Sequence, residues 1–144
     1  MRILFLCLGN ICRSAAAEGV ARHQAADLGL KLHIDSAGTG DYHAGEPPYG
    51  PMQQAARARG YDLSAQRARQ LRAADFTDFD LILAMDRQNF KDAQRVAPKG
   101  GTARLELFLA PLGLSDVPDP YYTRDFDGCL DLIERGVAAR LQAL

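Results

Sequence analysis

A short apolar run near the start of the chain leads through a turn directly into a helical segment. The run spans residues 2–6 and has the length and composition of a buried parallel strand. The turn contains Gly9 and Asn10, and strong helix formers continue from Ser14 until Gly29. A strand joined to a helix in this way is the opening unit of an α/β fold with a parallel sheet.

The rest of the chain continues this alternation. We expect strands at residues 31–36, 81–84 and 103–107, and helices at residues 51–60, from Asp86 to about residue 96, and from about Arg124 to the end. The stretch from 37 to 50 is rich in Gly and Pro and longer than most connections, which is typical of loops that carry function. These patterns predict a single three-layer α/β domain over residues 1–144, in which helices flank a four-stranded parallel sheet. Ligands of such sheets bind at the carboxyl ends of the strands.

The length and composition limit the classes of protein to which the chain can belong. Its 144 residues correspond to one domain, and 47% hydrophobic with 24% charged residues is the profile of an ordinary globular protein. The 17 Lys and Arg residues against 18 Asp and Glu residues give a net charge of -1. This balance argues against nucleic acid or an anionic membrane surface as the main partner, so any anion site must be local.

The first apolar run and the cysteines indicate the cell compartment. The run is far shorter than the ~20 residues that a membrane span needs, and no signal-peptide cleavage pattern follows it. The cysteines, Cys7, Cys12 and Cys129, are too few and too unevenly spaced for a disulfide-stapled secreted scaffold. We therefore expect a cytoplasmic protein with reduced thiols.

Residues 7–14, which we call the cysteine loop, occupy the turn between the first strand and the first helix. Backbone N–H groups of such a turn converge on one point, and the positive end of the helix dipole adds to them, so we expect the loop to bind phosphate. Gly9 and Asn10 tolerate the left-handed backbone angles that a tightly wrapped loop needs. The guanidinium of Arg13 can hold two phosphate oxygens. The loop lacks the Gly-Lys-Ser/Thr ending of a Walker nucleotide-binding loop.

Cys7 changes the expected role of this loop from binding to catalysis. A helix N-terminus and an adjacent Arg favour the thiolate form of a cysteine at neutral pH, so Cys7 is a candidate nucleophile toward phosphorus. The hydroxyl of Ser14 can donate a hydrogen bond to this thiolate. Two alternatives stay open, namely Cys7 as a small core residue and Cys7 with Cys12 as half of a zinc site. Because the histidines at positions 23, 33 and 43 are scattered, we expect no metal.

A combination of motifs resembles the low-molecular-weight protein tyrosine phosphatase family. The motifs are CLGNICRS at residues 7–14, SAGTG at 36–40 and VPDPYY at 117–122, and the resemblance extends from Arg2 to the last helix. It implies a hydrolase of phosphotyrosine and small aryl phosphate monoesters that works through a cysteinyl-phosphate intermediate. It also implies that Cys7 is the nucleophile, that Arg13 holds the phosphate and that no cofactor is needed.

The resemblance places the general acid at Asp119, in the Asp-Pro-Tyr motif. Chemistry independently requires such a group, because a phenolate leaving group with a pKa of about 10 needs a proton as its P–O bond breaks. Pro118 and Pro120 stiffen the chain on both sides of Asp119. Asp116 is the alternative acid, and a turn-capping role is the alternative for either carboxylate.

The resemblance also indicates which residues contact the substrate. Aromatic side chains at the mouth of a deep slot stack on a phosphotyrosine ring and favour it over the shorter phosphoserine. The implied substrate-binding residues are Leu8, Gly9, Asn10, Ile11, Cys12 and Ser14 in the loop, and Tyr42, Tyr121 and Tyr122 as aromatic walls. For Tyr42, an ordinary surface position is the alternative.

Other residues have implied roles around the cysteine loop. Cys12 resembles the family's second loop cysteine, which forms a reversible disulfide with the nucleophile and protects it from over-oxidation. Cys129 resembles a buried helix residue without such a role. Gln66 stands where many relatives have a His that braces the loop. A Gln at this position can hydrogen-bond Asn10 but cannot carry the charge, so the bracing role of Gln66 stays open.

Several alternative functions stay open beside the phosphotyrosine phosphatase. An arsenate reductase on the same fold needs a relay of thiols, but no cysteine lies between Cys12 and Cys129. The protein-arginine phosphatase branch of the family is associated with Thr at the position of Ile11. A non-catalytic phosphate-binding module needs only the loop and Arg13.

The expected partners follow from the phosphatase interpretation. They are tyrosine-phosphorylated proteins as substrates and inorganic phosphate as product and inhibitor, with no nucleic acid and no membrane. We expect a monomer or weak self-association. The basic residues at positions 57, 59, 67, 69 and 72 either recruit acidic substrates or form a solvated helix face.

Overall fold

Parallel strands form one sheet at the centre of the molecule. The computed structural model describes residues 1–144, and its strands are β1 (Arg2–Cys7), β2 (His33–Gly38), β3 (Leu81–Ala84) and β4 (Arg104–Leu107). Their order across the sheet is β2-β1-β3-β4, and all neighbouring strands pair in parallel. The predicted four-stranded parallel sheet is therefore confirmed.

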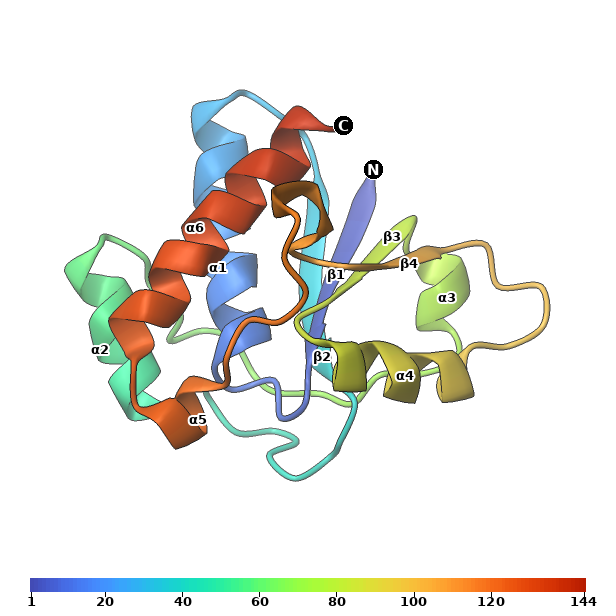
Figure 1. The fold of residues 1–144 in the computed structure, drawn as a ribbon, viewed down its shortest axis with the longest axis horizontal. Coiled ribbons are helices and arrows are strands. Elements are labelled where there is room, and N and C mark those ends of the chain that lie inside the picture. The colour runs from blue at the N-terminus through green and yellow to red at the C-terminus, as the bar shows by residue number, and fades with distance from the viewer.

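Helices cover both faces of the sheet (Figure 1). On one face lie α1 (Arg13–Asp27), α2 (Gly50–Ala58), α5 (Pro120–Thr123) and α6 (Phe126–Gln142), and on the other lie α3 (Asp75–Asp78) and α4 (Arg87–Val96). A short 3-10 turn, η1 (Ala110–Leu112), follows β4. This arrangement has the three layers that the alternation of elements predicts.

The side chains of β1 alternate between the two cores. Ile3, Phe5 and Cys7 belong to the larger apolar cluster, which lies between the sheet and helices α1 and α6. Leu4 and Leu6 belong to the smaller cluster on the side of α3 and α4. A strand that is buried on both faces has to be apolar throughout, which explains the continuous run at the start of the chain.

The predicted bounds agree with the structure at several elements and differ at β2. Strand β3 spans the predicted residues, and Asp86 caps α4 as expected. Strand β2 begins and ends two residues later than predicted, because Ala37 and Gly38 pair with the last residues of β1. The end of β2 is therefore a buried part of the sheet rather than the start of the long loop.

The sequence prediction missed the shortest helices and misplaced the start of the last one. Helices α3 and α5 have four residues each, which is too short for any helical periodicity to be visible. Helix α6 begins at Phe126 and not at Arg124, because Arg124 has a φ of 63° and interrupts the helical path. None of the helices is both long and apolar enough to cross a bilayer.

Candidate active site

Cys7 lies where β1 ends, and its sulfur is surrounded by hydrogen-bond donors. Its residue surface is only 3% exposed. The Ser14 hydroxyl lies 3.0 Å from Sγ, and the backbone N–H of Asn10 donates to Sγ over 3.3 Å. Donors at these positions stabilise negative charge on the sulfur. The Ser14 hydroxyl and the Asn10 N–H therefore both contact the sulfur of Cys7.

The backbone of the cysteine loop forms a cradle at the N-terminus of α1. The N–H groups of Leu8, Gly9, Ile11 and Cys12 donate to no other group of the protein. Unpaired N–H groups at the positive end of a helix form an anion site. Of the two residues expected in left-handed conformation, only Asn10 adopts it, with a φ of 59°.

Gly9 is needed for space rather than for its backbone angle, which corrects our expectation. A Cβ atom at Gly9 would lie 3.1 Å from Cδ2 of His43, which is a tight contact. The imidazole ring therefore lies directly against the loop. A side chain at this position would require the His43 ring to shift.

Asn10 joins the loop to a buried hydrogen-bond network. Its Nδ2 donates to Ser14 Oγ over 2.8 Å and to Ser36 Oγ over 2.9 Å, and its Oδ1 accepts from the Arg69 backbone N–H over 3.0 Å. Ser36 donates in turn to Oε1 of Glu18 over 2.6 Å. Burial raises the pKa of Glu18, and the hydrogen bond from Ser36 offsets part of this rise. The side chains of Asn10 and Ser14 therefore brace the loop and do not line the cavity.

Gln66 does not form the hydrogen bond to Asn10 that the sequence left open. Its Nε2 donates to the carbonyl of Ala15 over 3.0 Å, and its Oε1 is buried without a partner. The backbone of Arg69 already satisfies Asn10 Oδ1. Gln66 therefore hydrogen-bonds the first turn of α1 and not Asn10 of the loop.

The guanidinium of Arg13 is buried and held by carboxylates. Nη1 donates to Asp86 Oδ2 over 2.6 Å and to the Val117 carbonyl over 3.0 Å, and Nη2 lies 3.4 Å from Asp119 Oδ2. Burial alone would lower the pKa of Arg13, but the nearby Cys7, Asp86 and Asp119 raise it. Arg13 therefore stays charged beside the sulfur.

Asp86 is a site residue that sequence reasoning assigned only to a helix cap. Its Oδ1 does cap α4 by accepting from the backbone N–H of Asn89 over 2.7 Å, while its Oδ2 holds Arg13. A signal for this second role exists, because Asp86 follows β3, and β3 pairs with β1 so that their carboxyl ends adjoin.

The segment before α5 brings Asp119 to the site. The backbone N–H of Val117 donates to the carbonyl of Met85 over 2.8 Å, which fixes this segment beside the end of β3. Oδ1 of Asp119 accepts from the backbone N–H of Tyr121 over 3.0 Å, and Oδ2 faces Arg13. Asp116, the alternative acid, instead pairs with the backbone and side chain of Arg87 and lies outside the cavity.

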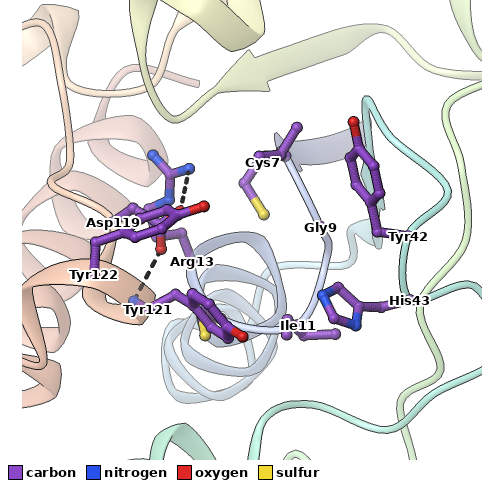
Figure 2. A pocket seen from close by; sticks show the side chains of 11 residues that line it. Cys7, Gly9, Ile11, Arg13, Tyr42, His43, Asp119, Tyr121 and Tyr122 are labelled. Carbon is purple, nitrogen blue, oxygen red and sulfur yellow. Dashed lines mark hydrogen bonds and ion pairs between the residues drawn. The ribbon is translucent and has the colours of Figure 1, made fainter.

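A cavity of about 370 Å³ opens over the cysteine loop. Figure 2 shows Tyr42 and His43 on one side of the Cys7 sulfur and Asp119, Tyr121 and Tyr122 on the other. The lining residues are Cys7, Leu8, Gly9, Ile11, Cys12, Arg13, Tyr42, His43, Asp119, Tyr121 and Tyr122. His43 is the lining residue that the sequence analysis missed, although its place next to Tyr42 in the long loop was a usable signal.

The other cysteines differ from Cys7 in their surroundings. Cys12 lines the cavity and Cys129 lies in α6, where it is buried as expected, and all cysteines are free thiols. Burial raises the pKa of Cys129 to about 12 and also raises that of Cys12. Cys12 and Cys129 are therefore neutral thiols at physiological pH.

The basic residues that we expected to form a solvated helix face or a substrate patch are mostly occupied within the protein. Arg59 pairs with Asp131 and Glu134 of α6. Arg69 and Arg72 pair with the buried Asp75. Arg59 and Arg69 therefore join elements of the fold, whereas Arg72 stays largely exposed.

Comparisons with known proteins match this chain along its full length. The family model described as low molecular weight phosphotyrosine protein phosphatase matches residues 2–144. The low molecular weight protein-tyrosine-phosphatase YfkJ of Bacillus subtilis is 41% identical over 147 residues, covering 99% of this chain and 94% of YfkJ. The crystal structure of YfkJ superposes with a TM-score of 0.94 at 40% identity and covers 99% of this chain and 93% of YfkJ.

More distant relatives share the fold equally well. A protein tyrosine phosphatase from Entamoeba histolytica has a TM-score of 0.91 at 33% identity, covering 98% of this chain and 94% of that one. The Drosophila arginine phosphatase has a TM-score of 0.94 at 29% identity, covering 99% of this chain and 97% of that one. Because the family model spans nearly every residue, the chain belongs to the low molecular weight phosphotyrosine protein phosphatase family.

Proposed function

We propose that this protein hydrolyses phosphotyrosine in proteins, and small aryl phosphate monoesters, through a cysteinyl-phosphate intermediate. The observation that carries the proposal is the convergence of Cys7, Arg13 and Asp119 in one cavity with tyrosine side chains at its mouth. A nucleophile, a phosphate-binding guanidinium and a proton donor are the groups that this reaction requires. The name of the relative YfkJ supports the same substrate.

In the first step, the Cys7 thiolate attacks phosphorus in line with the leaving aryl oxygen. A P–S bond forms as the P–O bond breaks, and the aryl oxygen takes a proton from the carboxyl group of Asp119. Arg13 and the free N–H groups of the loop hold the equatorial phosphate oxygens. Phosphate binding at Arg13 replaces its contact with Asp119, so that this carboxyl can carry the proton.

In the second step, water attacks the phosphorus of the cysteinyl-phosphate. The carboxylate of Asp119 accepts a proton from this water, the P–S bond breaks, and phosphate leaves. The electron pair of the broken bond returns to Cys7, whose thiolate is stabilised by Ser14 and by the Asn10 N–H. After the second step, Cys7 and Asp119 are back in the states in which they began the reaction.

The cavity favours an aryl phosphate over phosphoarginine, the substrate class in the name of the Drosophila relative. Ile11 lines the cavity with an apolar surface, and the tyrosines at the mouth suit an aromatic ring. A Thr at this position would instead offer a hydroxyl to a guanidinium nitrogen. Ile11 therefore supports phosphotyrosine.

We further propose a cytoplasmic, redox-sensitive phosphatase that inorganic phosphate inhibits as product and that acts as a monomer or a weak dimer. Substrates are tyrosine-phosphorylated proteins, and neither nucleic acid nor a membrane is a partner. Cys12 lies in the same loop as Cys7, so a Cys7–Cys12 disulfide formed by mild peroxide protects the nucleophile. Intact-mass analysis after peroxide then shows loss of two hydrogens and not a sulfonic acid.

Two variants test the proposed function. Cys7→Ser is expected to abolish hydrolysis of para-nitrophenyl phosphate. Asp119→Asn is expected to slow phenyl phosphate, whose leaving group needs a proton, about 10²-fold or more, and to slow activated aryl phosphates far less. Hydrolysis by the Cys7→Ser variant would contradict the proposal. An equal loss of rate in Asp119→Asn for all leaving groups would show that another residue is the general acid.

A further inference from the structure

An arginine lies at the edge of the cavity, beyond the wall formed by Tyr121. Nη1 of Arg124 donates to the Tyr49 hydroxyl over 3.0 Å and to the Tyr121 carbonyl over 3.4 Å. The guanidinium carbon lies 5.4 Å from the ring centroid of Tyr49 and 5.2 Å from that of Phe126. These contacts hold the charge in one place, since cations bind to aromatic faces at such distances.

The aromatic rings connect Arg124 to the cavity. The ring centroids of Tyr49 and Tyr121 are 5.3 Å apart, and Tyr121 lines the cavity over Cys7. The rings of Tyr49 and Tyr121 therefore lie between the guanidinium and the cavity. A peptide residue that flanks the phosphotyrosine can extend across these rings, because an extended chain advances about 3.4 Å per residue.

The charge of Arg124 is exposed and without a carboxylate partner within the protein. Arg13, Arg59 and Arg69 each form ion pairs, whereas no carboxylate lies within ion-pair distance of Arg124. The neighbouring Asp125 instead accepts from the Gly128 N–H over 2.8 Å and caps α6. Nη1 is held by Tyr49 and Tyr121, whereas Nε and Nη2 of Arg124 donate to no group of the protein. These two nitrogens can bind a carboxylate through two hydrogen bonds.

The backbone at Arg124 shows a further peculiarity of this position. Its φ of 63° lies in the left-handed region, where glycine is favoured and a long side chain is strained. The chain keeps a cation here in spite of that cost, and strain of this kind gathers at ligand-binding sites.

The opposite side of the cavity mouth carries the opposite charge. Asp41 is exposed and precedes the wall residue Tyr42, and the carboxylate of Glu46 lies 2.6 Å from Nδ1 of His43. A peptide across the mouth would therefore meet negative charge on the side of Tyr42 and positive charge beyond Tyr121. Such asymmetry selects the sequence and orientation of a bound peptide.

We propose that Arg124 is a specificity-determining residue that binds the carboxylate of a Glu or Asp residue flanking the phosphotyrosine. This inference rests on the proposed phosphatase function and adds a preference for acidic phosphopeptides. The pair forms at the protein surface, so its effect is modest and depends on salt.

Pairs of phosphotyrosine peptides that differ only by Glu or Gln at one position test the inference. The substituted positions cover two residues before and two after the phosphotyrosine, and the measured quantity is the ratio of kcat/KM for the Glu and Gln peptides. For the wild type we expect a ratio of about three or more at one position in low salt, falling toward one in high salt. Arg124→Gln lowers the ratio to about one, and Arg124→Lys keeps part of it.

Two further variants control for charge and for backbone strain. Arg135→Gln removes an exposed cation nine residues into α6, roughly 14 Å along its axis, and should leave the ratio unchanged. Arg124→Gly removes the same charge as Arg124→Gln while relieving the positive φ, so it keeps the test valid if the Gln variant folds poorly.

The outcomes separate the inference from the proposed function. A wild-type ratio of one at every position, or a preference that survives Arg124→Gln and Arg124→Gly, overturns the inference alone. Failure of the wild type to hydrolyse any phosphopeptide or para-nitrophenyl phosphate overturns the proposed function, and the inference with it. A preference for the Glu peptide that is lost in the Arg124 variants and kept in Arg135→Gln supports the inference.

Discussion

Asp86 connects the folding of a helix to the chemistry of the site through its two carboxylate oxygens. One oxygen caps α4 at Asn89, and the other holds Nη1 of Arg13 at 2.6 Å. Because Arg13 is buried, its guanidinium orientation depends on such fixed acceptors. Substitution to Asn can separate these roles, since Asn also caps helices but carries no charge.

We expect Asp86→Asn to fold normally and to lose activity. The loss of a charged hydrogen bond to Arg13 should lower kcat/KM for para-nitrophenyl phosphate about 10- to 100-fold. The variant should stay folded at the assay temperature, because the Val117 carbonyl and Asp119 still contact Arg13. Asp116→Asn is the matched control, because Asp116 pairs with Arg87 outside the cavity. Similar losses in both variants would show that Asp86 has no special connection to Arg13.

Individual site residues differed in how far the sequence revealed them. Spacing and chemistry within one short loop indicated Cys7 and Arg13, whereas Asp119 was indicated by the family resemblance of its motif together with the need for a proton donor. Asp86 reaches Arg13 through the pairing of distant strands, and His43 reaches the cavity through the path of a long loop. No local sequence pattern predicts such contacts, because they form only when the tertiary structure forms.

At the scale of elements, α6 packs closely because Gly136 lies where a side chain would not fit. A Cβ atom at Gly136 would lie 2.5 Å from the ring of Phe108 and 3.0 Å from Leu109. Phe108 is fully buried and meets Phe5 of β1 edge to face, with ring centroids 5.8 Å apart. The rings cannot yield without moving the sheet or the helix.

We therefore expect Gly136→Ala to destabilise the protein by about 1–3 kcal/mol, although Ala is the better helix former. Gly50→Ala is the matched control, because a Cβ atom at Gly50 in α2 would meet nothing within 4 Å. Because Gly50 is the first residue of α2, this substitution should stay within about 0.5 kcal/mol of wild type. Denaturant unfolding of both variants measures the difference, and equal stabilities would contradict this account of the packing.

Long or fully buried helices and strands were easier to predict from the sequence than short or partly exposed ones. Strand β3 and helix α4 were placed correctly, because a buried apolar run and an Asp cap are strong local signals. The start of β2 was misplaced, since alternation continues from Lys31 although pairing with β1 begins only at His33. The start of a strand depends on which residues of the neighbouring strand it pairs with, and the sequence of one strand alone does not specify this register.

At the scale of the whole molecule, buried charges make stability depend on pH. Asp75 is fully buried and accepts hydrogen bonds from Arg69 over 3.0 Å and from the Arg72 backbone over 2.8 Å. Burial alone would raise the pKa of Asp75, but these arginine contacts lower it below its ordinary value of 3.8. The ionised carboxylate thus stabilises the fold above that value, and the stabilisation is lost as pH falls through the lowered pKa.

We expect Asp75→Asn to lose about 3–5 kcal/mol of unfolding free energy at neutral pH, because it leaves Arg69 without its buried partner. The difference in unfolding free energy between Asp75→Asn and the wild type should become smaller as pH falls below about 4. Asp78→Asn, an exposed position in the same helix, should stay within about 0.5 kcal/mol of wild type at every pH. A gap for Asp75→Asn that stays constant down to low pH would contradict the assigned pKa direction.

The whole fold serves to bring distant segments to one edge of the sheet. The end of β1, the long loop after β2 and the segment before α5 meet at the cavity over Cys7, and Asp86 after β3 holds Arg13 beside it (Figures 1 and 2). The net charge of the chain is only -1, so anion binding depends on this local convergence of Arg13 and loop N–H groups.

Rapid-quench mass spectrometry during turnover of an activated aryl phosphate is the most direct test of covalent catalysis. In the Asp119→Asn variant, where breakdown of the intermediate is slowed, one phosphoryl group should accumulate on the peptide that contains Cys7 and decay as phosphate is released. Continued turnover with no phosphoryl group on that peptide at any time would contradict the mechanism.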